Sequence, residues 1–197
     1  MRVFAIAVPL LLVTAPFARA QDRATDRPVV VLSSGPDIGH RAPDFTLPWA
    51  SKDGVGPAES PYQLWGDLGK PIVLVFFSRA FTKSCTAEMQ KLNEQYETLF
   101  GTGVVVVGIS TDPSETQSRF AAQLGIPFRL LSDAGQKVAK KYGTSDQSGF
   151  IRRSVYVIDP AGKVGYRNMR FDPFDPKAYS ALGDAVKAAR TVQAPKR

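Results

Sequence analysis

Residues 72–88 read Ile72-Val-Leu-Val-Phe-Phe-Ser-Arg-Ala-Phe-Thr-Lys-Ser-Cys-Thr-Ala-Glu88 and contain Cys85, the only cysteine of the 197-residue chain. The apolar run 72–77 is mostly β-branched or aromatic, which predicts a buried strand. The residues from about Ser84 onward predict a helix, so Cys85 is expected in its first turn. Free backbone N–H groups and the helix dipole stabilise a thiolate there, and the thiolate is the reactive form of cysteine. This stretch therefore predicts a reactive thiol.

Residues 1–20 have the features of a signal peptide. One basic residue, Arg2, precedes an apolar run too short to span a bilayer, and Ala18-Arg-Ala20 follows it. We expect cleavage after Ala20, which lowers the net charge from +7 to about +5. The mature chain is then periplasmic or secreted, and we expect it to be soluble and free of the membrane.

The rest of the chain predicts one α/β domain. Residues 21–37 are expected to form an N-terminal tether, residues 38–192 the domain, and residues 193–197 a basic tail. The predicted strands are 45–47, 72–77, 104–109 and 128–131, with a hairpin from 155–158 and 163–166. The predicted helices are about 84–100, 114–124, 134–142 and 176–192, and residues 50–61 are expected to be a surface loop. Strands that alternate with helices before a late hairpin predict a mixed β-sheet flanked by helices.

The charged residues and the one histidine point to no nucleic-acid or metal site. Positive charge is scattered, as in Lys140-Lys141 and Arg152-Arg153, and no basic run is interleaved with aromatic residues. Solvated surface is the better interpretation of this charge. His40 lies in a segment rich in Gly and Pro without the partners that a metal site requires, so we interpret it as an exposed loop residue.

Several motifs, in this order, resemble the peroxiredoxin (AhpC/TSA) family of the thioredoxin-like superfamily. They are Ala42-Pro-Asp-Phe-Thr-Leu47, Thr82-Lys-Ser-Cys85 with Glu88, Val107-Gly-Ile-Ser-Thr-Asp112, Leu130-Leu-Ser-Asp133 and Arg153-Ser-Val-Tyr-Val-Ile-Asp-Pro160. The resemblance covers about residues 39–166. It implies a thioredoxin-like fold for the domain and a thiol-dependent peroxidase activity that needs no cofactor.

The resemblance also implies the site residues. The family pattern is a Pro, a Thr or Ser four residues later, the peroxidatic Cys three residues after that, and an Arg from a later strand. Thr82, Cys85 and Arg153 match this pattern, whereas Ser78 stands at the proline position. The family proline packs over the reactive sulfur and limits its overoxidation, so this replacement puts the efficiency of a peroxidase in question.

Each matched residue has a chemical role in displacement at a peroxide oxygen. Cys85 would attack, the Thr82 hydroxyl would hydrogen-bond the sulfur or the peroxide, and Arg153 would supply positive charge. Arg152 competes with Arg153, but alternation along a strand directs only one of them toward Cys85. Glu88 has two interpretations: it orients the Arg153 guanidinium, or it is an acid stabilised near a helix N-terminus.

The single cysteine limits the ways in which a sulfenic acid on Cys85 could be reduced. There is no Cys-x-x-Cys motif and no resolving cysteine, so the reductant must be an external thiol or a redox protein. Two alternatives stay open, a non-catalytic thioredoxin-like binding module and a single-cysteine thiol-disulfide carrier. A homodimer is among the assemblies that we consider for the chain.

Overall fold

The computed structural model describes residues 34–146 and 148–194. The predicted signal peptide, residues 21–33 of the predicted tether and most of the basic tail therefore lie outside the described residues. Within the described part, no helix combines the length and the apolar character needed to cross a bilayer.

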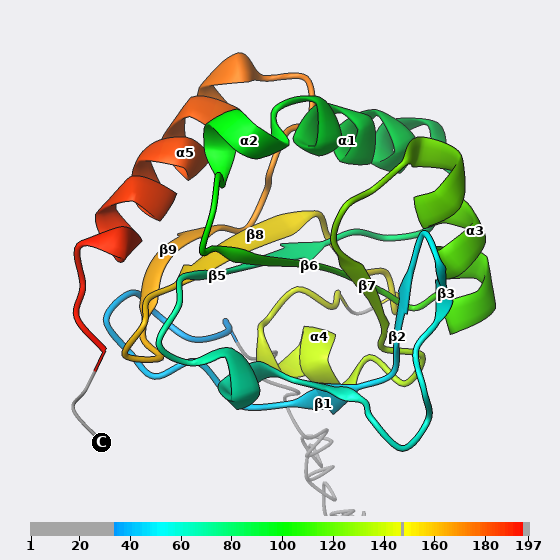
Figure 1. Ribbon diagram of the computed structural model, residues 1–197, viewed down its shortest axis with the longest axis horizontal. Coiled ribbons are helices and arrows are strands. Elements are labelled where there is room, and N and C mark those ends of the chain that lie inside the picture. The colour runs from blue at the N-terminus through cyan, green and yellow to red at the C-terminus, as the bar shows by residue number, and fades with distance from the viewer. Residues whose placement is uncertain (1–33, 147, 195–197) are drawn as a thin grey trace, which may run out of the picture. The chain divides into compact units, whose positions relative to one another are not determined.

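The core of the domain is a seven-stranded mixed sheet with the order β3-β2-β7-β6-β5-β8-β9 (Figure 1). A separate two-stranded sheet pairs β1 with β4. The strands are β1 (Thr46–Leu47), β2 (Trp49–Ser51), β3 (Gly54–Val55), β4 (Tyr62–Gln63), β5 (Ile72–Phe76), β6 (Val105–Ser110), β7 (Arg129–Ser132), β8 (Ser154–Ile158) and β9 (Val164–Asn168). Strands β5, β6 and β7 run parallel, and β8 and β9 add an antiparallel pair. The predicted mixed sheet is confirmed.

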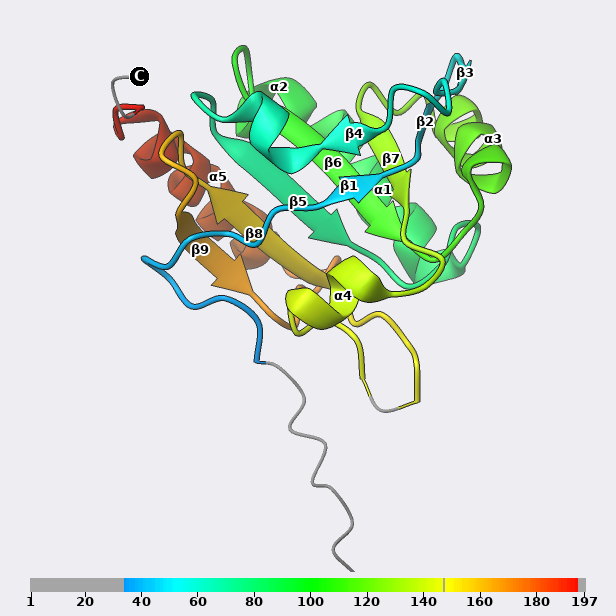
Figure 2. The ribbon, with the colours of Figure 1, turned by 90° about the horizontal axis from the view of Figure 1, so that it is seen from below.

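Helices cover one face of this sheet, and short elements cover the other. The helices are α1 (Lys83–Glu94), α2 (Tyr96–Leu99), α3 (Ser114–Leu124), α4 (Lys137–Lys141) and α5 (Pro176–Arg190), with a 3-10 turn, η1 (Leu64–Asp67). Figure 1 shows α1, α2, α3 and α5 on one side of the sheet, and Figure 2 shows α4, β1 and β4 across the opposite side. The sheet is therefore the middle layer of the domain.

Strand β5 contributes to the core on both faces. Val73 and Val75 pack in the cluster beneath the helices, together with Cys85. Ile72 and Leu74 pack in the second cluster, on the face covered by α4. Side chains of a strand alternate between the faces of its sheet, so a strand buried on both sides must be apolar at every position. That requirement explains the continuous apolar run from which the strand was predicted.

Three local predictions are wrong. The segment 50–61 is not wholly loop, because β2 and β3 form an antiparallel hairpin whose first strand pairs with β7. The helix expected over 84–100 is divided at Gln95, where φ and ψ are −103° and 12°. The helix expected over 134–142 begins only at Lys137, because Gln136 adopts a left-handed φ of 54°. Strands of two or three residues are too short to show a periodic pattern.

Residues 34–37, the last part of the predicted tether, contact strand β9. The guanidinium of Arg167 donates to the carbonyls of Ser34 and Pro36 at 3.2 and 3.1 Å and forms an ion pair with Asp37 at 2.6 Å. This end of the tether is therefore held against the domain.

Candidate active site

The register of the sheet brings the candidate residues to one edge. At the end of β5, Phe76 lies opposite Ser154 of antiparallel β8 and beside Ile109 of parallel β6. The segment that follows β5 and the residue that precedes β8 must therefore lie close together. The first of these leads to Cys85, and the second is Arg153.

The loop from Ser78 to Thr82 directs the chain from β5 into helix α1. Thr82 is the N-cap residue, and Cys85 is the third residue of the helix, in its first turn as predicted. Phe81 in this loop has a left-handed φ of 62°, a rare conformation for a bulky side chain. The backbone N–H of Ala80 donates to Asp112 Oδ2 at 2.7 Å, which fixes the loop to the residues that follow β6. Rare backbone conformations that persist only because neighbouring contacts hold them are concentrated at functional sites.

The sulfur of Cys85 is fully buried and contacts two polar side chains. Ser78 Oγ lies 3.4 Å from Cys85 Sγ, and Arg153 Nη2 donates to the same sulfur at 3.6 Å. Cys85 has no exposed surface, but Ser78 and Arg153 are both half-buried. The reactive atom therefore lies one side chain below the surface.

A buried carboxylate and a hydroxyl fix the position of Arg153. Its Nε donates to Glu88 Oε2 at 2.9 Å, and its Nη2 donates to Ser84 Oγ at 2.8 Å. Glu88 is fully buried one helical turn after Cys85. Burial raises the pKa of Glu88 well above its ordinary value, and the charge of Arg153 opposes this rise. The geometry favours the first interpretation of Glu88, a carboxylate that orients the guanidinium.

The surroundings of Cys85 favour its thiolate. Burial raises the pKa of the thiol, but the combined effect of the Arg79 backbone and the side chains of Ser78, Thr82 and Arg153 outweighs burial and lowers the pKa to about 7. Burial also lowers the pKa of Arg153, but Cys85 and Glu88 outweigh it and raise that pKa, so the guanidinium stays charged. At neutral pH about half of Cys85 would be ionised.

We expect the reactivity of Cys85 to rise with pH through a pKa near 7. With this pKa, about a tenth of the thiol is ionised at pH 6, about half at pH 7 and nearly all above pH 8. The reactivity follows this fraction because the thiolate is the form that reacts. The ultraviolet absorbance of the thiolate, followed from acid to alkaline pH, measures this titration, and the Cys85→Ser variant supplies the baseline. A midpoint at or above the value of free cysteine would contradict this account of the site.

Unlike Arg153, the side chains of Thr82 and Arg152 donate hydrogen bonds to backbone carbonyls. The Thr82 hydroxyl donates to the carbonyl of Arg79 at 3.0 Å and makes no capping bond to the described part of helix α1. Arg152 is exposed, and its guanidinium donates to the carbonyl of Gly143 at 2.8 Å. Both arginines precede β8 instead of lying within it, yet their side chains diverge as strand alternation predicts. Of the two arginines, only Arg153 contacts the sulfur.

Two residues of the site were missed from the sequence. Ser84 shares the Arg153 guanidinium with Cys85, and Asp112 anchors the loop before the helix. The same Asp112 oxygen also accepts a hydrogen bond from the hydroxyl of Ser110 at 2.8 Å, which holds the carboxylate in place. A signal for Asp112 was present, because it closes the motif 107–112 that contributed to the family resemblance. Ser84 lies within the motif 82–85 of the same resemblance, but the family pattern gives no role to its position.

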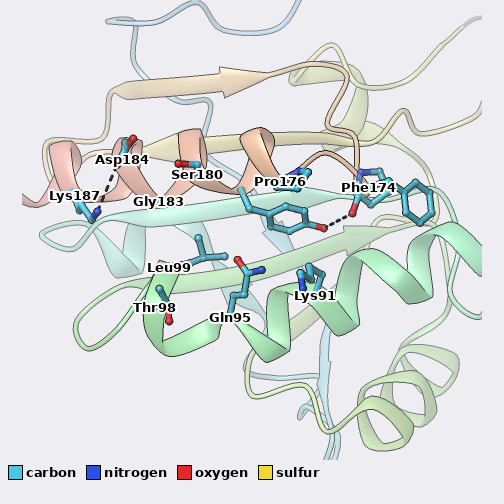
Figure 3. A pocket seen from close by; sticks show the side chains of 12 residues that line it. Lys91, Gln95, Thr98, Leu99, Phe174, Pro176, Ser180, Gly183, Asp184 and Lys187 are labelled. Atoms are coloured by element: carbon cyan, nitrogen blue, oxygen red, sulfur yellow. Dashed lines mark hydrogen bonds and ion pairs between the residues drawn. The ribbon is translucent and has the colours of Figure 1, made fainter.

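Two pockets share lining residues with each other, and one of them reaches this site. One, of about 350 Å³, lies between α5 and the α1–α2 segment, as Figure 3 shows for Lys91, Gln95 and Lys187. The second, of about 360 Å³, shares Pro173 and Phe174 with the first and is lined by Arg153 itself. Cys85 is among the lining residues of neither pocket. In residues 34–146 and 148–194, no group of three or more His, Cys, Asp or Glu is placed to hold a metal ion.

Comparison with known families identifies the relatives of this chain. Residues 38–167 match the AhpC/TSA family. The chain belongs to this family. It is 39% identical over 138 residues to the chloroplastic peroxiredoxin Q of Sedum lineare, which covers 68% of this chain and 70% of that protein. It is 37% identical to the chloroplastic peroxiredoxin Q of Triticum aestivum, of which the match covers 60%.

Solved structures show the same fold. Peroxidoxin BcpB from Mycobacterium tuberculosis superposes with a TM-score of 0.64 at 28% identity, over 81% of this chain and 99% of that one. The AhpC of Enterococcus faecalis gives a TM-score of 0.67 at 20% identity, over 78% and 92% of the two chains, and supports the fold alone. The thioredoxin-like fold and the peroxiredoxin resemblance are thus confirmed. With its single cysteine, this family member is of the one-cysteine type.

Proposed function

We propose that this AhpC/TSA family member is an exported thiol peroxidase that uses Cys85 as its nucleophile. The observation that carries the proposal is the contact of Arg153 with the Cys85 sulfur, in a guanidinium position fixed by buried Glu88. A thiol with a lowered pKa beside a fixed positive charge is the arrangement that displacement at a peroxide oxygen requires. The peroxiredoxin names of its relatives agree with this chemistry.

The first step consumes the peroxide. The Cys85 thiolate attacks one peroxide oxygen, an S–O bond forms, and the O–O bond breaks as the second oxygen leaves with its electron pair. Arg153 stabilises the negative charge on the leaving oxygen, which takes up a proton to give water or an alcohol. The sulfur is oxidised to a sulfenic acid, and the peroxide is reduced.

The second step needs a thiol from outside the chain. Without a second cysteine, the sulfenic acid is attacked by an external thiol, which gives a mixed disulfide and water. A second external thiol then releases the Cys85 thiol and leaves as a disulfide. Because Cys85 has no exposed surface, we propose hydrogen peroxide and small organic hydroperoxides as substrates.

The proposed site of action is outside the cytoplasm. Support comes from the sequence of residues 1–20, which lie outside the described residues and have the order of features of a cleavable signal. Secretion of the full-length chain and the N-terminal residue of the exported product would test this part of the proposal separately.

We expect one equivalent of peroxide to convert reduced protein to a sulfenic acid that dimedone traps on Cys85. Mass spectrometry of the intact protein and of its peptides measures the adduct, and Cys85→Ser is the control that should give none. A small thiol added before dimedone should prevent the adduct from forming, because that thiol reacts with the sulfenic acid first. An unmodified thiol after peroxide treatment would contradict the peroxidase. Mixed disulfides with other exported proteins formed without peroxide would favour the carrier.

A further inference from the structure

We propose that Ser78 supplies the hydroxyl group that hydrogen-bonds the reacting sulfur, a part that the family pattern gives to the threonine at position 82. The effect of Ser78 on catalysis rests on the proposed function. The contact between Ser78 Oγ and Cys85 Sγ does not, because it is present without any peroxide. It gives the residue at the family's proline position a chemical role of its own.

The hydrogen-bond geometry distinguishes the two hydroxyl groups. Ser78 Oγ lies 3.4 Å from Cys85 Sγ, and this sulfur is its one hydrogen-bond partner among the residues that the structure describes. Thr82 Oγ1 lies 3.0 Å from the carbonyl oxygen of Arg79, to which it donates. A hydroxyl has a single proton to give, so Thr82 has already used its own. A thiolate can only accept, and the Ser78 hydroxyl must therefore act as the donor.

A donor at this place matters because the sulfur is shielded from water. Cys85 has no exposed surface, so the negative charge of the thiolate must be stabilised by protein groups. Among the side chains that lower the pKa of Cys85, Ser78 has the largest effect, ahead of Thr82 and Arg153. A proline at position 78 would offer neither an N–H nor a hydroxyl donor. The serine thus gives stabilisation that the family residue lacks.

The test is the titration of Cys85 in three variants without any peroxide. Ser78→Ala should raise the pKa of Cys85 by about 1, which leaves roughly a tenth of the thiol ionised at pH 7. Thr82→Val should raise it by less, and Ser78→Thr, which keeps the hydroxyl, should stay near the wild-type value. Ser78→Pro should behave like Ser78→Ala in this titration.

The outcomes separate this inference from the proposed function. An unchanged pKa in Ser78→Ala, or a larger rise in Thr82→Val than in Ser78→Ala, would overturn the role of Ser78 whether or not the protein reduces peroxides. Ser78→Ala removes a single oxygen from a half-buried side chain, and its thermal unfolding compared with that of Ser78→Thr checks that both variants are folded. If the pKa rises as expected but wild-type protein does not react with peroxide, the inference stands and the peroxidase fails.

Discussion

Replacing Arg153 with alanine should slow the reaction of Cys85 with hydrogen peroxide by about 10²–10³-fold, the usual effect of removing one fixed donor to a developing negative charge. The guanidinium contacts the sulfur at 3.6 Å and would therefore stabilise the negative charge that develops in the proposed first step. The reaction should be followed by stopped flow at a pH where Cys85 is fully ionised in both proteins. The rate then reports charge stabilisation and not the thiolate fraction.

Arg152→Ala is the matched control for this experiment. It removes the same charge from the adjacent residue, but Arg152 is exposed and contacts the carbonyl of Gly143 instead of the sulfur. We expect its rate to stay within about twofold of wild type, because exposed charges are screened by water and salt. Equal losses in the two variants would mean that general positive charge, and not the position of Arg153, drives the reaction.

The second large effect is on stability. Arg153→Met should lower the free energy of unfolding by about 3 kcal/mol at neutral pH, because Glu88 is left buried without a counter-charge. Oε1 of Glu88 already has no hydrogen-bond partner among the described residues, so the carboxylate depends on Arg153. Urea denaturation of the reduced proteins measures the loss.

A double variant separates stability from chemistry. Adding Glu88→Gln to Arg153→Met removes the buried charge and should restore most of the lost stability, while the reaction with peroxide stays slow. In the single variant the charge of Arg153 no longer opposes the effect of burial, so the pKa of Glu88 in the folded state should rise further above its unfolded value. Its stability should therefore fall as the pH rises through the carboxyl range, and the defect should shrink in acid. A double variant as unstable as the single one would show that lost packing, not the unpaired charge, causes the defect.

Local chemistry explains which parts of the fold could be predicted. Strand β5 was predicted correctly because burial on both faces requires a continuous apolar run. The C-terminus of α3 was indicated by Gly125, which adopts a left-handed φ of 65°. The β2–β3 hairpin has no such pattern in its sequence, because its strands have only three and two residues. Its position is set by the pairing of β2 with β7. Elements held by long-range pairing cannot be recognised from their own short sequences.

In the candidate site, too, some features could be predicted from local sequence and others depend on tertiary contacts. Cys85 in the first helical turn follows from the strand and helix pattern, and the choice of Arg153 over Arg152 required the family resemblance. The hydrogen bonds of Ser78 and Thr82 could not be predicted, because they depend on how the loop 78–82 folds around Phe81 and Asp112. The carboxylate partner of Arg153 was one of two interpretations of Glu88, and the 2.9 Å contact with the guanidinium, together with the burial of Glu88, favours it.

The most direct test of the central claim is the stopped-flow rate at which hydrogen peroxide oxidises Cys85 in the reduced wild-type protein. The comparison is free cysteine at the same concentration of thiolate. Because the site adds a fixed positive charge to an ionised thiol, we predict a rate at least about 10²-fold above that of the free amino acid. A rate equal to that of free cysteine would contradict the account and leave the fold as a binding module.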